Sequence, residues 1–317
     1  MTTLSFKFIQ ILLLSGLLLF FGCHQEPALP TTLIPPGCRL GLATYINENT
    51  SDSTAYLHDS FGYVLQSSAT RKERGRVVRQ LVNTFSYTDD HYLSNRVDRL
   101  TTSAANGQTN TSNGTFVYEY AGTPKRIQAI KRINTTGSLD SPLTITYQYT
   151  GDQLTQYSEV DGNGTSSYQV VFGANGKINR IQVPNNQTVE VLNGLISKTI
   201  SGKDTVRFTY DGQNQLVSQD FVYGAAKERV IRELTYDGRQ PTRTGELRLP
   251  GFPTNAVSGY GQAKSNVLTE TTRRFRNGFL TETTPLRYTY SFNGEGYPTG
   301  YARTDGTRAR FYYTNCP

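Results

Sequence analysis

The stretch Thr205-Val206-Arg207-Phe208-Thr209-Tyr210-Asp211-Gly212 decides the fold of this chain. Between residues 205 and 210 the even-numbered positions are apolar or aromatic and the odd-numbered positions are polar. Alternate side chains of a β-strand point to opposite faces, so this pattern predicts a strand with one buried face and one wet face. The Asp-Gly pair that follows reaches positive φ at little cost, which tight hairpins require. The segment therefore predicts a strand that turns back on itself.

The same period of two recurs along the chain, for example in Ile145–Thr150 and Leu286–Phe292. These segments are rich in Tyr, Thr, Val and Phe, residue types that fit a pleated, half-buried surface. No stretch is a convincing amphipathic helix. The sequence therefore predicts an all-β fold, an antiparallel meander of repeated hairpins that forms a curved or partly closed sheet. The polar stretch Thr101–Gly114 is expected to be a longer loop between strands.

The hairpin units resemble one another, because an aromatic pair two residues apart is followed by a glycine turn and then an apolar residue. Across adjacent strands such pairs form a stripe stabilised by cross-strand contacts. This stripe is either the half-buried face of a sheet, with hydroxyl groups at its solvent edge, or a surface on which a ligand stacks. The tyrosines of this possible binding face are Tyr118, Tyr120, Tyr147, Tyr149, Tyr210, Tyr236, Tyr288 and Tyr290.

Two units, Tyr210-Asp211-Gly212 with Leu216 and Tyr236-Asp237-Gly238-Arg239, resemble the YD repeats of RHS-type proteins. In other units the Asp is replaced, as by Thr150 or Ala121. The whole chain resembles small lipoproteins of Bacteroidota-type bacteria that combine a lipidation signal, a proline-rich linker and degenerate YD-like hairpins. The resemblance implies a long antiparallel meander on the cell envelope and supplies no reaction.

The chain begins with features of an exported lipoprotein. Lys7 precedes the apolar run Phe8–Phe21, which is shorter than the roughly 20 residues of a membrane-spanning helix and fits a secretory signal. We therefore interpret residues 1–22 as a signal peptide and Cys23, which follows Gly22, as the lipidated residue that holds the protein at the outer membrane. The alternative is an ordinary secretory signal with an accidental cysteine.

Residues 23–37 contain four prolines and are expected to form an extended tether between the lipid and the fold. Residues 38–317 are expected to form a single β-rich domain of YD-like hairpins. Cys38 and Cys316 bracket this domain, and in an oxidising compartment they are expected to form a disulfide. The alternative is a pair of free thiols.

The net charge of the chain is +7, with basic clusters at Arg71–Arg76 and Arg273–Arg276. Such clusters are either solvated surface or a contact with an anionic envelope component, such as lipopolysaccharide phosphates or acidic glycans. The expected partners are the membrane, through the lipid on Cys23, and anionic envelope glycans or another envelope protein. Nucleic acid is not expected as a partner of an exported lipoprotein.

The chain has three histidines, and its densest cluster of acids and imidazole is Asp89-Asp90-His91, which we interpret as a turn in which Asp caps main-chain groups. Asp161-Gly162-Asn163-Gly164 lacks the closing glutamate of a calcium loop and predicts a hairpin. We therefore assign no metal site, no cofactor and no catalytic residue.

Three classes of function remain open. The first is a non-enzymatic envelope protein that binds or scaffolds, with an unknown ligand. The second is a lipid-handling or membrane-associated β half-barrel, which requires an apolar cavity inside the sheet or an outward apolar band with aromatic girdles. The third is a polysaccharide hydrolase, which requires two carboxylates facing each other in a cleft.

Lipidation is directly testable. Metabolic labelling with a radioactive fatty acid is expected to mark the wild-type chain and not the Cys23→Ala variant, because the thiol is the attachment site. Equal labelling of the two chains would contradict the assignment.

Overall fold

A computed structural model describes residues 39–314 except 105, 138–141, 152, 163, 175, 185–186 and 240–264. The signal peptide, the tether, Cys23, Cys38 and Cys316 lie outside the described residues, so lipidation and the disulfide stay predictions. Among the described residues, no helix has the length and apolar character needed to cross a membrane.

Twenty β-strands make up the described part of the chain. They are β1 (Arg39–Ile46), β2 (Thr50–His58), β3 (Val64–Glu73), β4 (Arg76–Tyr87), β5 (Leu93–Ser103), β6 (Thr109–Ala121), β7 (Arg126–Ile133), β8 (Leu143–Thr150), β9 (Gln153–Asp161), β10 (Gly164–Phe172), β11 (Ile178–Val183), β12 (Gln187–Leu192), β13 (Leu195–Ser201), β14 (Asp204–Tyr210), β15 (Leu216–Tyr223), β16 (Glu228–Tyr236), β17 (Val267–Arg276), β18 (Phe279–Phe292), β19 (Pro298–Arg303) and β20 (Arg308–Thr314).

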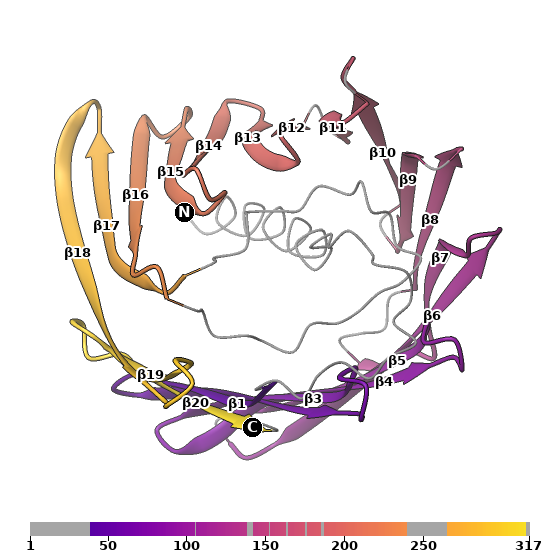
Figure 1. Ribbon diagram of the computed structural model, residues 1–317, viewed down its shortest axis with the longest axis horizontal. Helices are drawn as coiled ribbons and strands as arrows, with labels where there is room; N and C mark the ends of the chain where they lie inside the picture. Colours follow the sequence, from indigo (N-terminus) through magenta and orange to yellow (C-terminus); the bar gives the residue numbers. More distant parts are fainter. Residues whose placement is uncertain are drawn as a thin grey trace.

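Every strand pairs antiparallel with the next one along the chain, as the alternation and the Asp/Asn-Gly turns predict. The meander then closes, because β20 also pairs antiparallel with β1, from Arg39 opposite Thr314 to Ile46 opposite Arg308. The sheet is therefore a full β-barrel (Figure 1). The predicted antiparallel meander is confirmed. The prediction that the sheet is only curved or partly closed was wrong, because the sheet closes completely. No local pattern in the sequence encodes a pairing between the first and last strands.

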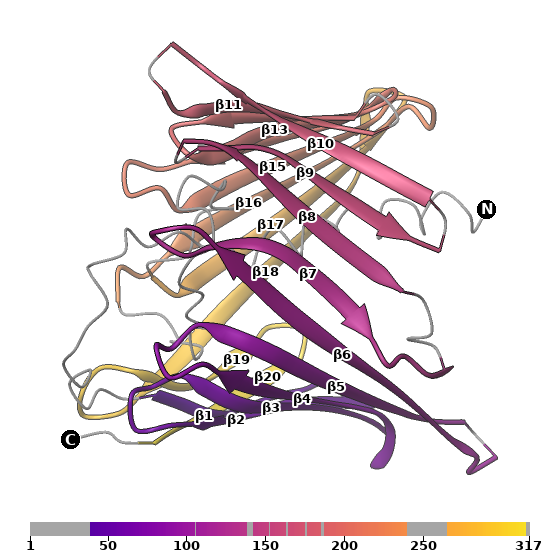
Figure 2. The same ribbon diagram turned by 90° about the vertical axis from the view of Figure 1, so that its right-hand side faces the viewer.

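The barrel has two rims, at which different hairpins turn (Figure 2). Each even-numbered strand is joined to the next odd-numbered strand at one rim, which we call the tyrosine rim. Each odd-numbered strand is joined to the next even-numbered strand at the opposite rim.

Tyrosines near the ends of even-numbered strands bond to the neighbouring strand at the tyrosine rim. The Tyr149 hydroxyl at the end of β8 donates to the Ile127 carbonyl at the start of β7, with 3.0 Å between the two oxygens. Each such bond ties the tip of one hairpin to the strand before it. The other pairs, written donor first, are Tyr87 with Val64, Tyr120 with Leu93, Tyr210 with Ile196, Tyr236 with Leu216, and Tyr313 with Pro298.

The residue after such a tyrosine organises the turn. The Asp211 N–H donates to the Gln215 carbonyl at 2.9 Å, and Asp211 Oδ1 accepts from the Gln215 N–H at 2.8 Å. Asn214, one residue earlier, has φ of +64°, which explains the preference for Gly or Asn in these turns. Tyrosine, carboxylate and turn residue therefore form one structural unit that is recognisable in the sequence.

The cluster Asp89-Asp90-His91 has the same turn geometry. The Tyr92 N–H donates to Thr88 Oγ1, the Thr88 N–H donates to the Tyr92 carbonyl, and His91 has φ of +65°. The cluster is a turn, as interpreted, but the side chain that bonds to its main-chain groups is that of Thr88 and not the expected aspartate.

The stretch Thr101–Gly114 is not a long loop, contrary to expectation. It forms the end of β5 and the start of β6, with Thr101 opposite Thr111, and the Ala104 N–H donates to the Gln108 carbonyl at 2.8 Å where the two strands connect. Here mainly polar residues, several of them Thr, extend the barrel wall, so the strands continue beyond the segments with clear hydrophobic alternation.

The two faces of the barrel differ in chemistry. A closed sheet crowds the side chains on its concave face and separates those on its convex face, so the buried side chain of each alternating pair points inward. On β14, Val206 and Phe208 are buried at 4% and 7% exposure, whereas Arg207 is exposed. On β8, Ile145 and Tyr147 are buried between exposed outward residues. On these two strands the inner wall is therefore apolar and aromatic, and the outer wall is polar.

The tyrosine bonds are expected to stabilise the barrel. Tyr149→Phe should lower the free energy of unfolding by about 1–2 kcal/mol, because the Ile127 carbonyl loses its side-chain donor. Urea denaturation followed by circular dichroism measures this. Tyr312→Phe is the matched control, since that ring is half exposed on the outer wall and should change little. Equal effects of the two substitutions would contradict a role for the hydroxyl bond.

Candidate functional site

The eight tyrosines predicted as a binding face all lie on the inner wall, but not all are available to a ligand. The hydroxyls of Tyr120, Tyr149, Tyr210 and Tyr236 donate to main-chain carbonyls, and Tyr147 is buried at 7% exposure. These rings belong mainly to the packed lining of the barrel. The remaining three are Tyr118, which packs against the buried cluster of β6–β17, and Tyr288 and Tyr290, which belong to a separate group of rings.

That group, which we call the aromatic band, crosses four neighbouring strands of the inner wall. The Tyr290 and Tyr301 ring centroids lie 5.5 Å apart, and Tyr301 lies 6.2 Å from Phe311. Most of its rings are only half buried, and Tyr45 is 40% exposed. The band consists of Tyr45 on β1, Tyr288, Tyr290 and Phe292 on β18, Tyr301 on β19 and Phe311 on β20.

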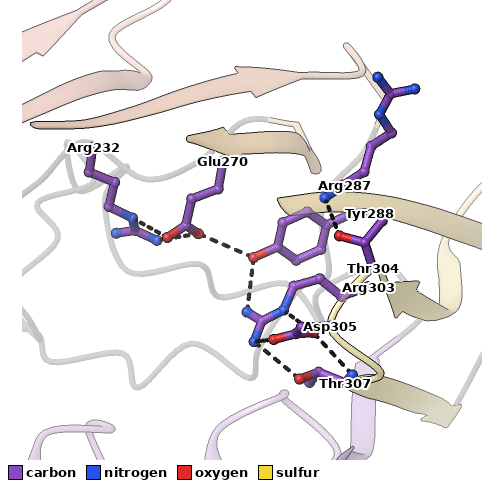
Figure 3. Close-up of polar contacts among 8 residues, drawn as sticks. All are labelled: Arg232, Glu270, Arg287, Tyr288, Arg303, Thr304, Asp305 and Thr307. Atoms are coloured by element: carbon purple, nitrogen blue, oxygen red, sulfur yellow. Dashed lines mark hydrogen bonds and ion pairs between the residues drawn. The ribbon is translucent and has the colours of Figure 1, made fainter. Parts of the chain in front are cut away.

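A chain of ion pairs and hydrogen bonds, which we call the ionic network, adjoins the band (Figure 3). Arg232 on β16 makes two bonds to Glu270 on β17, with N–O distances of 2.8 and 2.9 Å. Glu270 Oε2 accepts from the Tyr288 hydroxyl at 3.2 Å. Arg303 on β19 donates to that hydroxyl at 3.3 Å and makes two bonds to Asp305. Arg232, Glu270, Tyr288, Arg303 and Asp305 thus link four strands, and the network meets the band at Tyr288.

Figure 3 also shows how alternation sorts side chains on β18. Tyr288 points toward Glu270 and Arg303, whereas its neighbour Arg287 points to the other side of the sheet. The Arg287 main-chain N–H donates to Thr304 Oγ1 at 3.1 Å. The network therefore belongs to the inner wall.

Both carboxylates of the network stay ionised at neutral pH. Burial by itself raises the pKa of Glu270, but the hydrogen bonds and charge of Arg232 outweigh it and hold this pKa below its usual range. The hydrogen bonds from Arg303 hold the pKa of Asp305 low. Burial raises the pKa of the Tyr301 phenol to about 12, so this hydroxyl stays protonated. The site offers ring faces, phenol groups and paired charges, and neither of these two carboxylates suits a general acid.

A second cluster lies on the inner wall of β8, β9 and β10. The Tyr157 and Tyr168 rings stack at 4.3 Å with an interplanar angle of 6°, and Tyr147 lies 6.2 Å from Tyr157. The Tyr157 hydroxyl is buried, with no hydrogen-bond partner within the described ranges. Burial, helped by the charge of Asp161, raises the pKa of Glu159 beside this stack.

The ionic network was missed in the sequence because its members come from four strands. A signal for it does exist. Arg232 occupies the same alternating set as Leu234 and Tyr236, so a charged residue stands where the pattern requires an inward side chain. A charge at an inward position must be paired, and its partner Glu270 lies opposite Leu234 on the next strand.

Other predicted residues have different outcomes. No group of three or more His, Cys, Asp or Glu that could hold a metal occurs among the residues described. Asp161 and Gly164 are paired across the β9–β10 turn, in agreement with the predicted hairpin.

No family model matches the chain, and no curated protein sequence does either. Solved structures to which the chain shows a weak similarity include porin-like proteins of Bacteroides uniformis and Bacteroides vulgatus. The first is 10% identical with a TM-score of 0.37, covering 87% of this chain and 96% of that one. The second is 9% identical with a TM-score of 0.36, covering 87% and 99%. A TcdB2–TccC3 structure is 11% identical with a TM-score of 0.29, covering 83% of this chain and 17% of that one. The likeness to YD repeats and to small lipoproteins stays a prediction.

The Arg232–Glu270 pair is expected to stabilise the barrel in a pH-dependent way. Because folding lowers the pKa of Glu270, its contribution is present above the ordinary carboxyl pKa of about 4.3 and is lost as the pH falls through the lower folded value. Glu270→Gln should therefore lower the urea midpoint at pH 7 and have a smaller effect near pH 3. Glu282→Gln, at an exposed ion pair with Arg274, is the control and should change little at either pH. A loss that is the same at both pH values would contradict this electrostatic role.

Proposed function

We propose that this chain is a non-enzymatic cell-envelope lipoprotein that binds a ligand on the inner wall of its barrel, at the aromatic band. The observation that carries the proposal is the presence of half-exposed rings beside a fully paired ionic network on a concave surface. Ligand sites are concave, mostly apolar and aromatic, and oriented by a few polar groups. A ligand with flat apolar faces and some polar groups suits this combination.

The polar outer wall supports a barrel surrounded by water. A barrel that spans a membrane needs an outward apolar band with aromatic girdles. Outward positions on β8 and β14 are instead Thr, Gln and Arg, and ion pairs such as Arg229 with Asp220 lie on the outer wall. We therefore place the domain beside the outer membrane, held by lipid on Cys23.

The alternative of a polysaccharide hydrolase is favoured by one observation. Glu159 and Asp161 are alternate residues of β9, so they share the inner face, next to the Tyr157–Tyr168 stack. A carboxyl with a raised pKa beside a second carboxyl is the kind of pair that acid–base hydrolysis of glycosides uses. In this alternative, Glu159→Gln abolishes release of reducing sugar from a polysaccharide; in a binding protein, no such release occurs in the wild type.

Binding is testable with N-phenyl-1-naphthylamine, an uncharged two-ring probe that fluoresces in apolar surroundings. The wild-type chain is expected to bind it saturably. Replacing both Tyr290 and Tyr301 by Ala should weaken the affinity about tenfold, since each lost ring contact is worth about 0.5–1.5 kcal/mol.

Tyr312→Ala, which removes an exposed outer-wall ring, is the matched control and should leave the affinity unchanged. Circular dichroism spectra of all variants should coincide. Unsaturable fluorescence, or equal affinity of the double variant and the wild type, would overturn the proposed site.

A further inference from the structure

The two basic clusters of the sequence lie at the same rim of the barrel. Arg71–Arg76 surrounds the β3–β4 turn and Arg273–Arg276 precedes the β17–β18 turn. Both turns join an odd-numbered strand to an even-numbered one, so both lie at the rim opposite the tyrosine rim (Figure 2). Segments about 200 residues apart in sequence thus face the same side of the molecule.

Each of these hairpins also carries exposed apolar side chains. Phe279 at the tip of the β17–β18 hairpin is 77% exposed and the adjacent Leu280 is 55% exposed. Val77 at the β3–β4 hairpin is 39% exposed. The fold of the barrel does not bury these apolar side chains. Removing them from water requires contact with an external surface.

Several cations at these tips are free for an external anion. Within the described ranges, no carboxylate lies within ion-pairing distance of Lys72, Arg74 or Arg276, which are all exposed. Lys227 in the neighbouring β15–β16 turn adds a further exposed cation, with its carbonyl accepting from the Asn277 N–H at 2.9 Å. Other arginines are committed, since Arg273 pairs with Glu233 at 2.6 Å.

We propose that the β17–β18 and β3–β4 tips form a docking surface for an anionic lipid membrane, into which Phe279 and Leu280 insert. The two features point to one occupant. Cations near a membrane surface are attracted to anionic headgroups, and apolar residues beside them enter the headgroup and acyl boundary. A soluble acidic glycan accounts for the cations but gives Phe279 and Leu280 nothing apolar to enter. This surface is distinct from the aromatic band and does not depend on it.

The absence of tryptophan from the chain makes a sharp experiment possible. Phe279→Trp and Leu192→Trp each place a unique reporter in the full chain, one at the docking surface and one at the tyrosine rim. Leu192 is the matched control, because it is 64% exposed at the end of β12. The emission of each variant is recorded with vesicles of phosphatidylcholine alone or mixed with phosphatidylglycerol, and with brominated acyl chains as quencher.

The Phe279→Trp emission is expected to shift to shorter wavelength and to be quenched by the brominated chains when phosphatidylglycerol is present. The Leu192→Trp emission is expected to stay that of a solvated indole, even in a chain held to the vesicle by its lipid. Adding Arg74→Ser or Arg276→Ser should lower the partition coefficient of the tip into these vesicles about fivefold for each cation removed.

Three outcomes would overturn the proposal. The first is a Phe279→Trp emission whose wavelength and quenching do not change when phosphatidylglycerol is added to the vesicles. The second is a Leu192→Trp emission that shifts equally, which would show that the tyrosine rim faces the bilayer. The third is a shift that appears without vesicles and grows with protein concentration, which would identify a second copy of the chain as the occupant. Failure of probe binding at the aromatic band has no bearing on any of these results.

Discussion

The pairing of β1 with β20 is the constraint on which the rest of the structure depends. The nineteen other pairings join neighbours in sequence, and each is satisfied in an open sheet as well as in a closed one. Only the contact from Arg39–Thr314 to Ile46–Arg308 converts the meander into a barrel. Closure leaves no free edge among the described strands, so main-chain groups that could pair with another molecule are used internally. It also gives the sheet an inside, where the aromatic band and the ionic network lie together.

Local features of the fold follow from the sequence, and distant ones do not. The alternation in Thr205–Tyr210 and the Asp-Gly turns were enough to predict most strands, their antiparallel order and the shared face of the tyrosines. The polar strands around Thr101 were missed, because hydrophobic alternation is not clear in this stretch. Closure was missed for a different reason. Whether the last strand of a twisted sheet pairs with the first depends on the number of strands in the whole sheet and not on any local pattern. The network of Arg232, Glu270 and Arg303 was missed for a similar reason. Its members follow the alternation of their own strands, but the contacts between them depend on how separate strands are placed.

The inner and outer walls of the barrel, and its two rims, differ in the polarity of their side chains. On the inner wall, ionised groups such as Arg232 and Glu270 are paired, and the rings of the aromatic band are half exposed. On the outer wall, alternating Thr, Gln and Arg residues keep the sheet compatible with water. The rims differ as well: at the tyrosine rim, hydroxyls and turn carboxylates bond to main-chain groups, whereas at the opposite rim the exposed cations Lys72, Arg74 and Arg276 lie beside the apolar tips. A ligand and a surface can therefore be engaged at separate places.

The tyrosine bonds have a consequence for how barrels of this kind change size. Each bond joins a hairpin only to the strand before it, as Tyr149 does with Ile127. None of these bonds crosses the lumen to another part of the barrel. Deleting or duplicating one two-strand unit therefore leaves every other unit with its own partner and preserves the parity that lets the last strand meet the first. The circumference, and with it the width of the lumen, can change in steps of two strands. Lineages can thus vary what the interior holds by gene-level gain or loss of repeats, without redesigning the wall.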